Sequence, residues 1–475
     1  MTDISKLTAA EMSDAFANSS LSPIEVVQDA LKRIDDWNPA LNAFSHVDYD
    51  GALNAARAAE QRWFKNEARS GLDGVPVTIK DIMWSSDWPT TYGSNVLASD
   101  EPAAADAPCV ARLKEAGTVL LGMTTTPELG WKAVTDSPRL GVTRNPWNTD
   151  LTPGGSSGGA GAAAALNLGA LHIGTDGGGS IRIPSAFCGV TGHKPSFGRV
   201  PAYPMSAFGT VAHIGPMTRT VRDTALMLDV ISQPDKRDWY ALPYDKQSFT
   251  ACLAQDMSGL RVAYSPDLGY MKVDPEVAGL ARGAISTFEE LGATVEEVAP
   301  IFDDPRDIFE VIWFSAAVEK FKGLSSEDRN RLDPALAAML ETRAGATLTD
   351  YLGATHERCG LGARMMQFHT EWDLLVTPTL PIPAFEVGCV APDGGENWVD
   401  WAGFSYPFNL TQQPACTVPC GLTAAGLPVG LQIIGPRFDD IGVLRAAHAF
   451  EQRRSWEWPA RPVIPEAVKE MQAAV

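Results

Sequence analysis

Several residue types are scarce in this sequence, and each scarcity excludes a class of protein. The seven cysteines are odd in number, scattered, and without the spacing of metal ligands, so we expect reduced thiols and no metal site. Lysine and arginine total 38 against 58 acidic residues, a net charge of −20. Because phosphate contacts need basic patches, nucleic acid is not expected as a partner, and the acidity indicates solubility.

Long apolar runs and targeting signals are also missing. No stretch approaches the roughly 20 apolar residues of a membrane span. The first residues, Met1 to Leu7, lack the basic region and the apolar run of a signal peptide. We therefore expect a cytoplasmic protein with no membrane partner.

Two common catalytic and binding signatures are absent as well. The seven histidines have no partner motif at the spacing of a catalytic triad, so the sequence indicates no histidine base. Neither G-x-x-x-x-G-K-[ST] nor a strand-flanked G-x-G-x-x-G with a downstream ribose carboxylate occurs. A non-enzymatic phosphate- or nucleotide-binding protein, with a phosphate held by glycine-rich loops, is nevertheless kept as an alternative.

Glycine is abundant in two loops, 154–159 (GGSSGG) and 174–182 (GTDGGGSIR). Each glycine gives up more chain entropy on folding than any other residue, so such runs indicate close approach of bare backbone to another group. The three glycines before Ser180 can point successive N–H groups at one place and form a concavity for an oxyanion. This pattern is typical of acyl transfer with Ser180 as the nucleophile.

A serine nucleophile needs a base, and Ser–Lys pairs are an established solution. Lys80 ends the apolar run that begins at Gly74, which predicts a buried strand, and burial lowers the pKa of a lysine. Holding an ordinary lysine neutral near pH 7.4 costs about 4 kcal/mol, which the fold must supply. The neighbouring Asp81 is equally consistent with orienting Lys80 and with capping the next segment.

At these residues the chain resembles the amidase signature family of serine amidohydrolases. The similarity extends from about Ser22 to Arg437 and is densest between Gly74 and Pro195. It includes the closing segments 404–411 (FSYPFNLT) and 426–432 (GLPVGLQ). The resemblance implies one α/β/α sandwich around a large mixed β-sheet.

The resemblance also implies a catalytic set of three residues, with Ser180 as nucleophile, Ser156 as a relay serine after a cis peptide bond, and Lys80 as base. No cofactor is required. The backbone N–H groups that would form the oxyanion hole belong to Gly177, Gly178, Gly179 and Ser180. Supporting hydrogen bonds around the catalytic groups are expected from Ser157, Thr175, Asp176 and Arg182.

The function expected from these residues is hydrolysis of a carboxylic acid amide to an acid plus ammonia or an amine, through an acyl-Ser180 intermediate. One alternative is a glutamine-dependent amidotransferase A-type subunit. Another comes from G-x-S-x-G at Ser156, the nucleophile elbow of α/β-hydrolases, which needs a strand directly before the serine. The preceding segment, 144–153, carries two prolines and polar turn formers, so this alternative is disfavoured.

The partner expected is a small-molecule amide, and its identity is only partly indicated. An aromatic pocket would favour an uncharged aryl or alkyl acyl group. No arginine is placed to bind a substrate carboxylate, so dicarboxylic half-amides and glutamine are less expected as substrates. Esters, anilides, hydrazides and carbamates share the same attack geometry and are not excluded as substrates. The residues expected to bind substrate are Trp84, Trp131, Phe208 and Trp313, with Trp88, Phe314, Met83, Thr126 and Met205 as further candidates.

Helix and strand signals alternate along the chain, which indicates an α/β layered sheet. A capping box at Ser22 to Glu25 predicts a helix start. We expect a single domain over residues 1–475, with a helical segment over about 1–66 and a signature core over about 74–220; a homodimer is possible. Further helices are expected over 52–65, 107–115, 160–168, 221–231 and 275–291, and strands at 118–122, 260–264 and 374–377.

Overall fold

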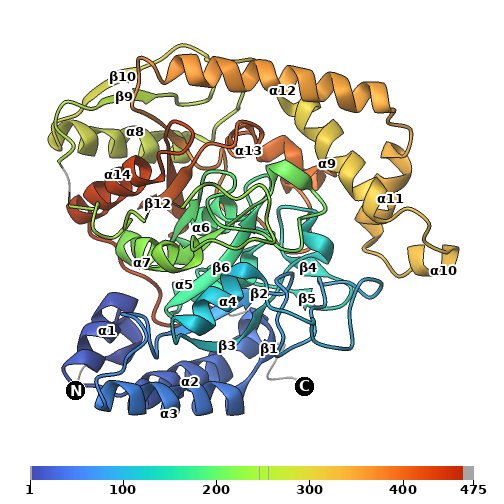
Figure 1. Cartoon of the computed structure of the whole chain (residues 1–475). Helices are drawn as coiled ribbons and strands as arrows, with labels where there is room; N and C mark the ends of the chain where they lie inside the picture. Colours follow the sequence, from blue (N-terminus) through green and yellow to red (C-terminus); the bar gives the residue numbers. More distant parts are fainter. Residues whose placement is uncertain (1–2, 245, 255, 464–475) are drawn as a thin grey trace.

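One mixed β-sheet of eleven strands forms the centre of the computed structural model, which describes residues 3–244, 246–254 and 256–463 (Figure 1). The strand order is β1-β3-β2-β6-β8-β7-β12-β13-β11-β9-β10. Strand β2 runs parallel to both of its neighbours. The neighbouring strands β6, β8, β7, β12 and β13 pair antiparallel in that order across the sheet. The strands of the sheet are β1 (Phe44–Val47), β2 (Pro76–Lys80), β3 (Val119–Thr124), β6 (Leu171–Asp176), β7 (Thr191–Lys194), β8 (His213–Thr218), β9 (Arg261–Tyr264), β10 (Thr294–Glu297), β11 (Leu374–Pro378), β12 (Ala415–Leu422) and β13 (Pro428–Ile434).

The central strands are apolar on both faces because helices cover both sides of the sheet. In β11, Leu374 and Val376 join one hydrophobic cluster while Leu375 joins another, as the two-residue period of a strand requires. The first cluster also contains side chains of α1 (Ala9–Ala17), α4 (Pro108–Glu115), α7 (Val221–Ile231), α8 (Pro275–Glu290) and α14 (Asp440–Arg453). The other face is covered by α2 (Pro23–Leu41), α3 (Tyr49–Phe64), α5 (Gly158–Ala165), α6 (Arg182–Cys188), α9 (Arg306–Lys320), α11 (Pro334–Arg343) and α12 (Leu348–Phe368).

This architecture confirms the predicted α/β fold around a large mixed sheet. Helix α2 begins at the expected capping box, with the Ser22 backbone N–H donating to the Glu25 carboxylate at 2.9 Å. The N-terminal segment is not purely helical, however. Its strand β1 pairs antiparallel with β3, so this segment forms an edge of the same sheet as the signature core.

A helical region over 306–368 was not anticipated from the sequence. It comprises α9, α10 (Ser326–Arg329), α11 and α12, which occupy the upper and right-hand side of the molecule in Figure 1. Helix α9 packs against both α12 and α11. Helix α9 matters for the candidate site because its Trp313 lies against Gly177, in the glycine loop that follows β6.

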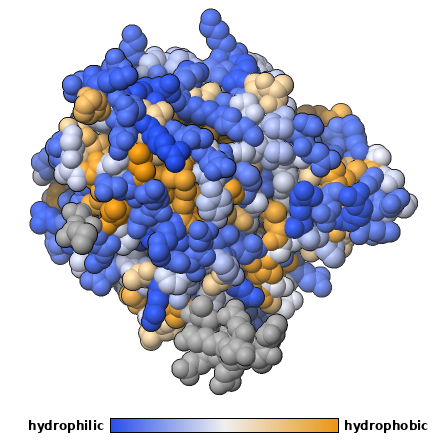
Figure 2. All heavy atoms as spheres, turned by 90° about the horizontal axis from the view of Figure 1, so that it is seen from below, coloured by the Kyte–Doolittle hydropathy of each residue, from blue (hydrophilic) through white to orange (hydrophobic). Residues whose placement is uncertain are grey.

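No helix in the described part of the chain is long and apolar enough to cross a membrane. On the face seen in Figure 2, hydrophilic residues predominate and hydrophobic side chains form separate areas between them.

The parallel pairing of β2 with β6 positions the candidate site. Val77 lies opposite Leu171 and Thr78 opposite His172. The carboxyl ends of parallel strands lie at the same edge of a sheet, so the last residue of β2, Lys80, comes close to the residues at the end of β6. The glycine loop of residues 177–180 leaves the sheet at that edge.

Candidate active site

Lys80 is fully buried and its side-chain nitrogen contacts three hydroxyl groups. Lys80 Nζ lies 2.7 Å from Ser156 Oγ, 2.9 Å from Ser157 Oγ and 2.9 Å from Thr175 Oγ1. Burial lowers the pKa of Lys80 well below its ordinary value, and the nearby Asp176 carboxylate only partly opposes this. The fold therefore favours the neutral amine.

A neutral amine has two N–H donors and one lone pair, so one of the three hydroxyls must donate to it. The Ser157 hydroxyl lies 3.2 Å from the carbonyl oxygen of Thr175 and can donate its proton there. In that arrangement, the hydroxyl of Ser156 or of Thr175 donates to the neutral Lys80 amine.

Ser156 and Ser180 line the same cavity, which has a volume of about 260 Å³. Ser156 follows a cis peptide bond after Gly155 and comes just before α5. Ser180 lies between β6 and α6 and is 7% exposed. Two serines that lie far from Lys80 in the sequence thus line one cavity.

The glycine loop before Ser180 differs from expectation at one position. The N–H of Gly179 donates to Asp176 Oδ1 at 2.8 Å, so it is already engaged and we correct its inclusion in the oxyanion hole. In the described part of the chain, no protein acceptor is recorded for the N–H groups of Gly177, Gly178 and Ser180. These three stay candidates for the oxyanion hole.

The close approach that the glycines permit is to side chains. A Cβ at Gly177 would lie 2.5 Å from the ring of Trp313. Gly179 has φ +129°, and a Cβ there would lie 2.3 Å from Ser405 Oγ. Any larger residue would push the loop away from the cavity wall.

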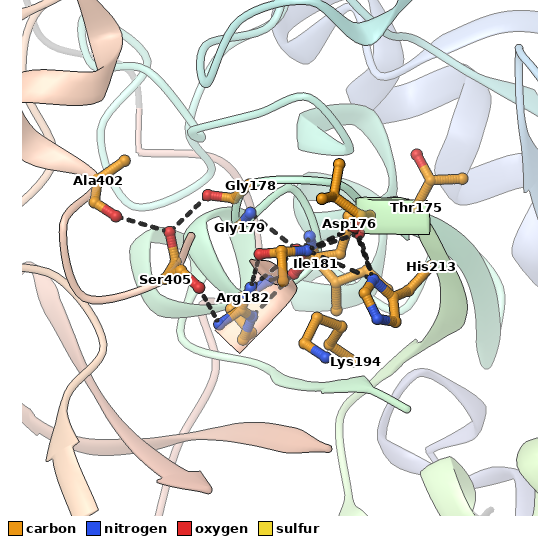
Figure 3. A network of polar contacts seen from close by, with 12 residues as sticks. Thr175, Asp176, Gly178, Gly179, Ile181, Arg182, Lys194, His213, Ala402 and Ser405 are labelled. Atoms are coloured by element: carbon orange, nitrogen blue, oxygen red, sulfur yellow. Dashed lines mark hydrogen bonds and ion pairs between the residues drawn. The ribbon is translucent and has the colours of Figure 1, made fainter. Parts of the chain in front are cut away.

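A buried ion pair fixes the glycine loop from behind (Figure 3). Asp176 accepts two hydrogen bonds from the Arg182 guanidinium at 2.9 Å, and both side chains are fully buried. Burial alone would raise the pKa of Asp176, but the charge and hydrogen bonds of Arg182, together with the Lys194 charge and the Asn409 hydrogen bond, hold that pKa well below its usual range. Arg182 also donates to Ser405, Asn409 and Gln432. Asp176 and Arg182 therefore brace the loop instead of contacting Lys80.

Replacing Arg182 with alanine should cost the folded state about 3–5 kcal/mol, because the Asp176 carboxylate would stay buried without its partner. The free energy of unfolding in urea measures this. The exposed Arg282, which pairs with Glu297 at 2.9 Å, provides the control, since Arg282→Ala should change stability little. Equal, small losses in both variants would contradict the bracing role.

The aromatic residues expected to bind substrate divide into two groups. Trp84, Phe208 and Trp313 line the cavity, together with Met83 and Met205. Phe208 stacks on Trp313 at a centroid distance of 3.6 Å. The prediction for Trp131 needs correction, because this residue lies behind Trp313, whose indole N–H donates to the Trp131 carbonyl at 3.1 Å. The further candidates that do not line the cavity are Trp88, Phe314 and Thr126.

Sequence reasoning missed several residues of the cavity wall, because nothing in their local pattern sets them apart from core or loop residues. His213 is one of them. Its Nδ1 lies 2.8 Å from the Val211 carbonyl and 3.1 Å from that of Asp176, and burial lowers the pKa of the ring well below 6.5. The ring is therefore neutral, and it makes no recorded hydrogen bond to Ser156 or Ser180. The other missed residues include Ile82, Tyr92, Leu129, Ile214 and Lys320.

Comparison with known proteins agrees with this geometry. The model of the Amidase family matches residues 25–444. The chain belongs to the amidase signature family. This amidase is 39% identical to an acylamidase of Rhodococcus erythropolis over 95% of its own length and 96% of the relative's. It is 36% identical to the A-type subunit of the glutamyl-tRNA(Gln) amidotransferase of Chloroflexus aggregans, over 96% and 98% of the two chains.

A solved structure gives the same result for the fold. A bacterial aryl acylamidase of the amidase signature family matches this amidase with a TM-score of 0.89 and 32% identity, over 96% of this chain and 98% of that one. The enzyme is therefore a hydrolase of carbon–nitrogen bonds in linear amides. The α/β-hydrolase alternative does not fit, because the strand nearest before Ser156, β5 (Gly141–Val142), ends well upstream of that residue. Membership of an enzyme family also replaces the alternative of a non-enzymatic nucleotide-binding protein.

Proposed function

We propose that this amidase hydrolyses uncharged aryl or alkyl amides through an acyl-Ser180 intermediate. The observation that carries the proposal is the contact of the buried Lys80 amine with Ser156 Oγ at 2.7 Å, at the wall of the cavity that Ser180 also lines. The aromatic wall formed by Trp84, Phe208 and Trp313 favours a flat or apolar group. The similarity to an acylamidase and an aryl acylamidase supports the same class.

In the first half of the proposed reaction, Ser180 Oγ attacks the amide carbonyl while its proton passes to Ser156 and the proton of Ser156 passes to neutral Lys80. The negative charge that develops on the carbonyl oxygen is stabilised by backbone N–H groups of the glycine loop. Lys80 then returns a proton through Ser156 to the leaving nitrogen, which departs as ammonia or an amine.

In the second half, a water molecule attacks the acyl-Ser180 ester and loses its proton along the same relay. Lys80 then returns this proton through Ser156 to Ser180 Oγ as the tetrahedral intermediate breaks down to the carboxylic acid and free Ser180. Each half-reaction returns Lys80 to its neutral form, so the low pKa set by burial serves both halves. No oxidant, metal or carrier takes part in these steps.

A cytoplasmic location and a homodimeric state complete the proposal. The second candidate function is an amidotransferase A-type subunit, favoured by the similarity to that subunit of a glutamyl-tRNA(Gln) amidotransferase. Such a chain would depend on partner chains for its reaction, whereas an acylamidase would not.

The purified chain alone should hydrolyse anilides and simple aryl or alkyl amides, and it should prefer them to glutamine. Hydrolysis is measured by release of the amine or ammonia over a panel of amides that differ in their acyl and amine halves. The preference follows from the apolar part of the cavity wall, formed by Trp84, Phe208 and Trp313, where a charged acyl group would lose hydration. Hydrolysis of glutamine alone, or activity only after partner chains are added, would favour the amidotransferase function.

A further inference from the structure

The loop that follows the catalytic strand is tied to Asp81, the residue next to Lys80. The Asp81 carboxylate accepts hydrogen bonds from the N–H of Thr91 at 2.7 Å and from its hydroxyl at 2.5 Å. The Asp81 carbonyl accepts from the N–H of Tyr92 at 3.0 Å. Asp81 makes no recorded hydrogen bond to Lys80, so its structural task is to fix Tyr92.

The backbone of Tyr92 is fixed on its other side as well. Its carbonyl accepts a hydrogen bond from the N–H of Leu129 at 2.7 Å. Gly130, which follows Leu129, lies close to Ser156. A Cβ at Gly130 would lie 3.1 Å from Ser156 Oγ. The Tyr92 side chain thus enters the cavity from a rigid position beside the catalytic serines.

The hydrogen-bond polarity of the Tyr92 hydroxyl is set by Trp84. The indole N–H of Trp84 lies 2.5 Å from the Tyr92 oxygen, and an indole can only donate. The Tyr92 oxygen is therefore an acceptor in this bond, and its own proton stays available. In the described part of the chain, no acceptor for that proton is recorded. Burial raises the pKa of Tyr92 although the Trp84 contact opposes it, so the phenol keeps its proton at neutral pH.

Much of the remaining cavity wall is apolar, with Ser206 and Lys320 among its polar residues. Ile82, Met83, Leu129 and Phe208 line the same cavity as Tyr92. In a mostly apolar cavity, one donor without a protein partner discriminates strongly between ligands that can and cannot accept from it.

We propose that Tyr92 is a specificity-determining residue whose hydroxyl donates to an acceptor oxygen of the substrate other than the oxygen of the scissile amide. The preferred substrates then carry a carbonyl or similar oxygen on an otherwise apolar group. Trp84 orients the hydroxyl and Asp81 positions its backbone. This inference rests on the proposed amidase function and adds the recognition of a second polar group.

The test uses matched substrate pairs and the Tyr92→Phe enzyme. One pair consists of anilides of a single acid with a 4-acetyl or a 4-ethyl ring, and the other of amides of 4-acetyl- and 4-ethylbenzoic acid. Tyr92→Phe should lower kcat/KM about tenfold for the acetyl member of one pair, as expected for one lost hydrogen bond, and less than about twofold for its ethyl partner. The affected pair shows whether the acceptor belongs to the amine or to the acyl half.

Tyr203→Phe is the matched control, because Tyr203 packs edge-on against Trp84 at 6.0 Å but does not line the cavity. It should change both members of each pair equally. Equal losses for the acetyl and ethyl members in Tyr92→Phe would place its hydroxyl on the scissile amide and overturn the proposal. No loss in either pair would overturn it too.

Binding of the same compounds to Ser180→Ala, with and without Tyr92→Phe, gives a second readout by calorimetry that needs no turnover. If wild type hydrolyses neither pair, the amidase proposal fails at that step. The recognition proposal is then judged on binding alone: a selective loss of affinity for the acetyl compounds supports it, and unchanged affinities refute it.

Discussion

Ser180→Ala should lower amide hydrolysis by about 10⁴-fold or more while leaving the fold intact, because the alanine cannot form the acyl intermediate. Ser180 Oγ makes no recorded hydrogen bond in the described part of the chain, so its removal leaves no buried partner unsatisfied. The measurement is kcat/KM on the best anilide of the panel, with circular dichroism to verify the fold.

A covalent label identifies the nucleophile independently of the rate. A phosphonate or slowly hydrolysed acyl compound should add one group to wild type, and peptide mass spectrometry should place that group on Ser180. The Ser180→Ala protein should stay unlabelled. A label on Ser156 would contradict the assignment, since both serines line the cavity that the reagent would enter.

Lys80→Ala should lower kcat/KM by about 10²–10⁴-fold and remove one ionisation from the pH–rate profile. In wild type the base must be neutral, so kcat/KM should rise with pH through the lowered pKa of Lys80 and then reach a plateau. The profile is measured for both proteins on one substrate. A mutant that keeps the rising limb at a comparable rate would show that Lys80 only supports the structure.

Lys194 offers a matched control for this experiment. It is also fully buried, burial also lowers its pKa well below the ordinary value, and its Nζ donates to the carbonyls of Pro195 and Gln413. Lys194→Met should therefore keep the rising limb if the protein folds. Lys80→Arg should not restore activity, because a guanidinium stays protonated throughout the accessible range.

Local sequence signals predicted much of the fold because they act over short distances. The capping box set the start of α2, and the helical period set α7 at the expected residues 221–231. Strands β6 to β8 and the helices over 306–368 were not predicted. The capping box at Thr347 and Asp350, which begins α12, was a local signal that went unused. The short strands carry no comparable cap, and their structure depends on neighbours that lie far away in the sequence.

The candidate site shows the same division. Lys80 and the serine loops were selected by residue type and spacing, and the structure brings Lys80 and Ser156 within 2.7 Å. The engagement of Gly179 by Asp176 could not be foreseen, since it depends on how the loop turns back on itself. The place of Trp131 behind Trp313, and of Tyr92 in the cavity, depends on packing between segments that no local pattern encodes.

The brace behind the nucleophile loop has a consequence for synthesis of the chain. Lys80, Ser156 and Ser180 have all left the ribosome long before Asn409 and Gln432, the side chains that hold Arg182 from the other end of the sequence. A nascent or truncated chain that ends before Asn409 contains Lys80, Ser156 and Ser180 but lacks Asn409 and Gln432 as partners of Arg182. We therefore expect the glycine loop to reach its observed geometry only after the C-terminal part of the chain has been made and has folded against it.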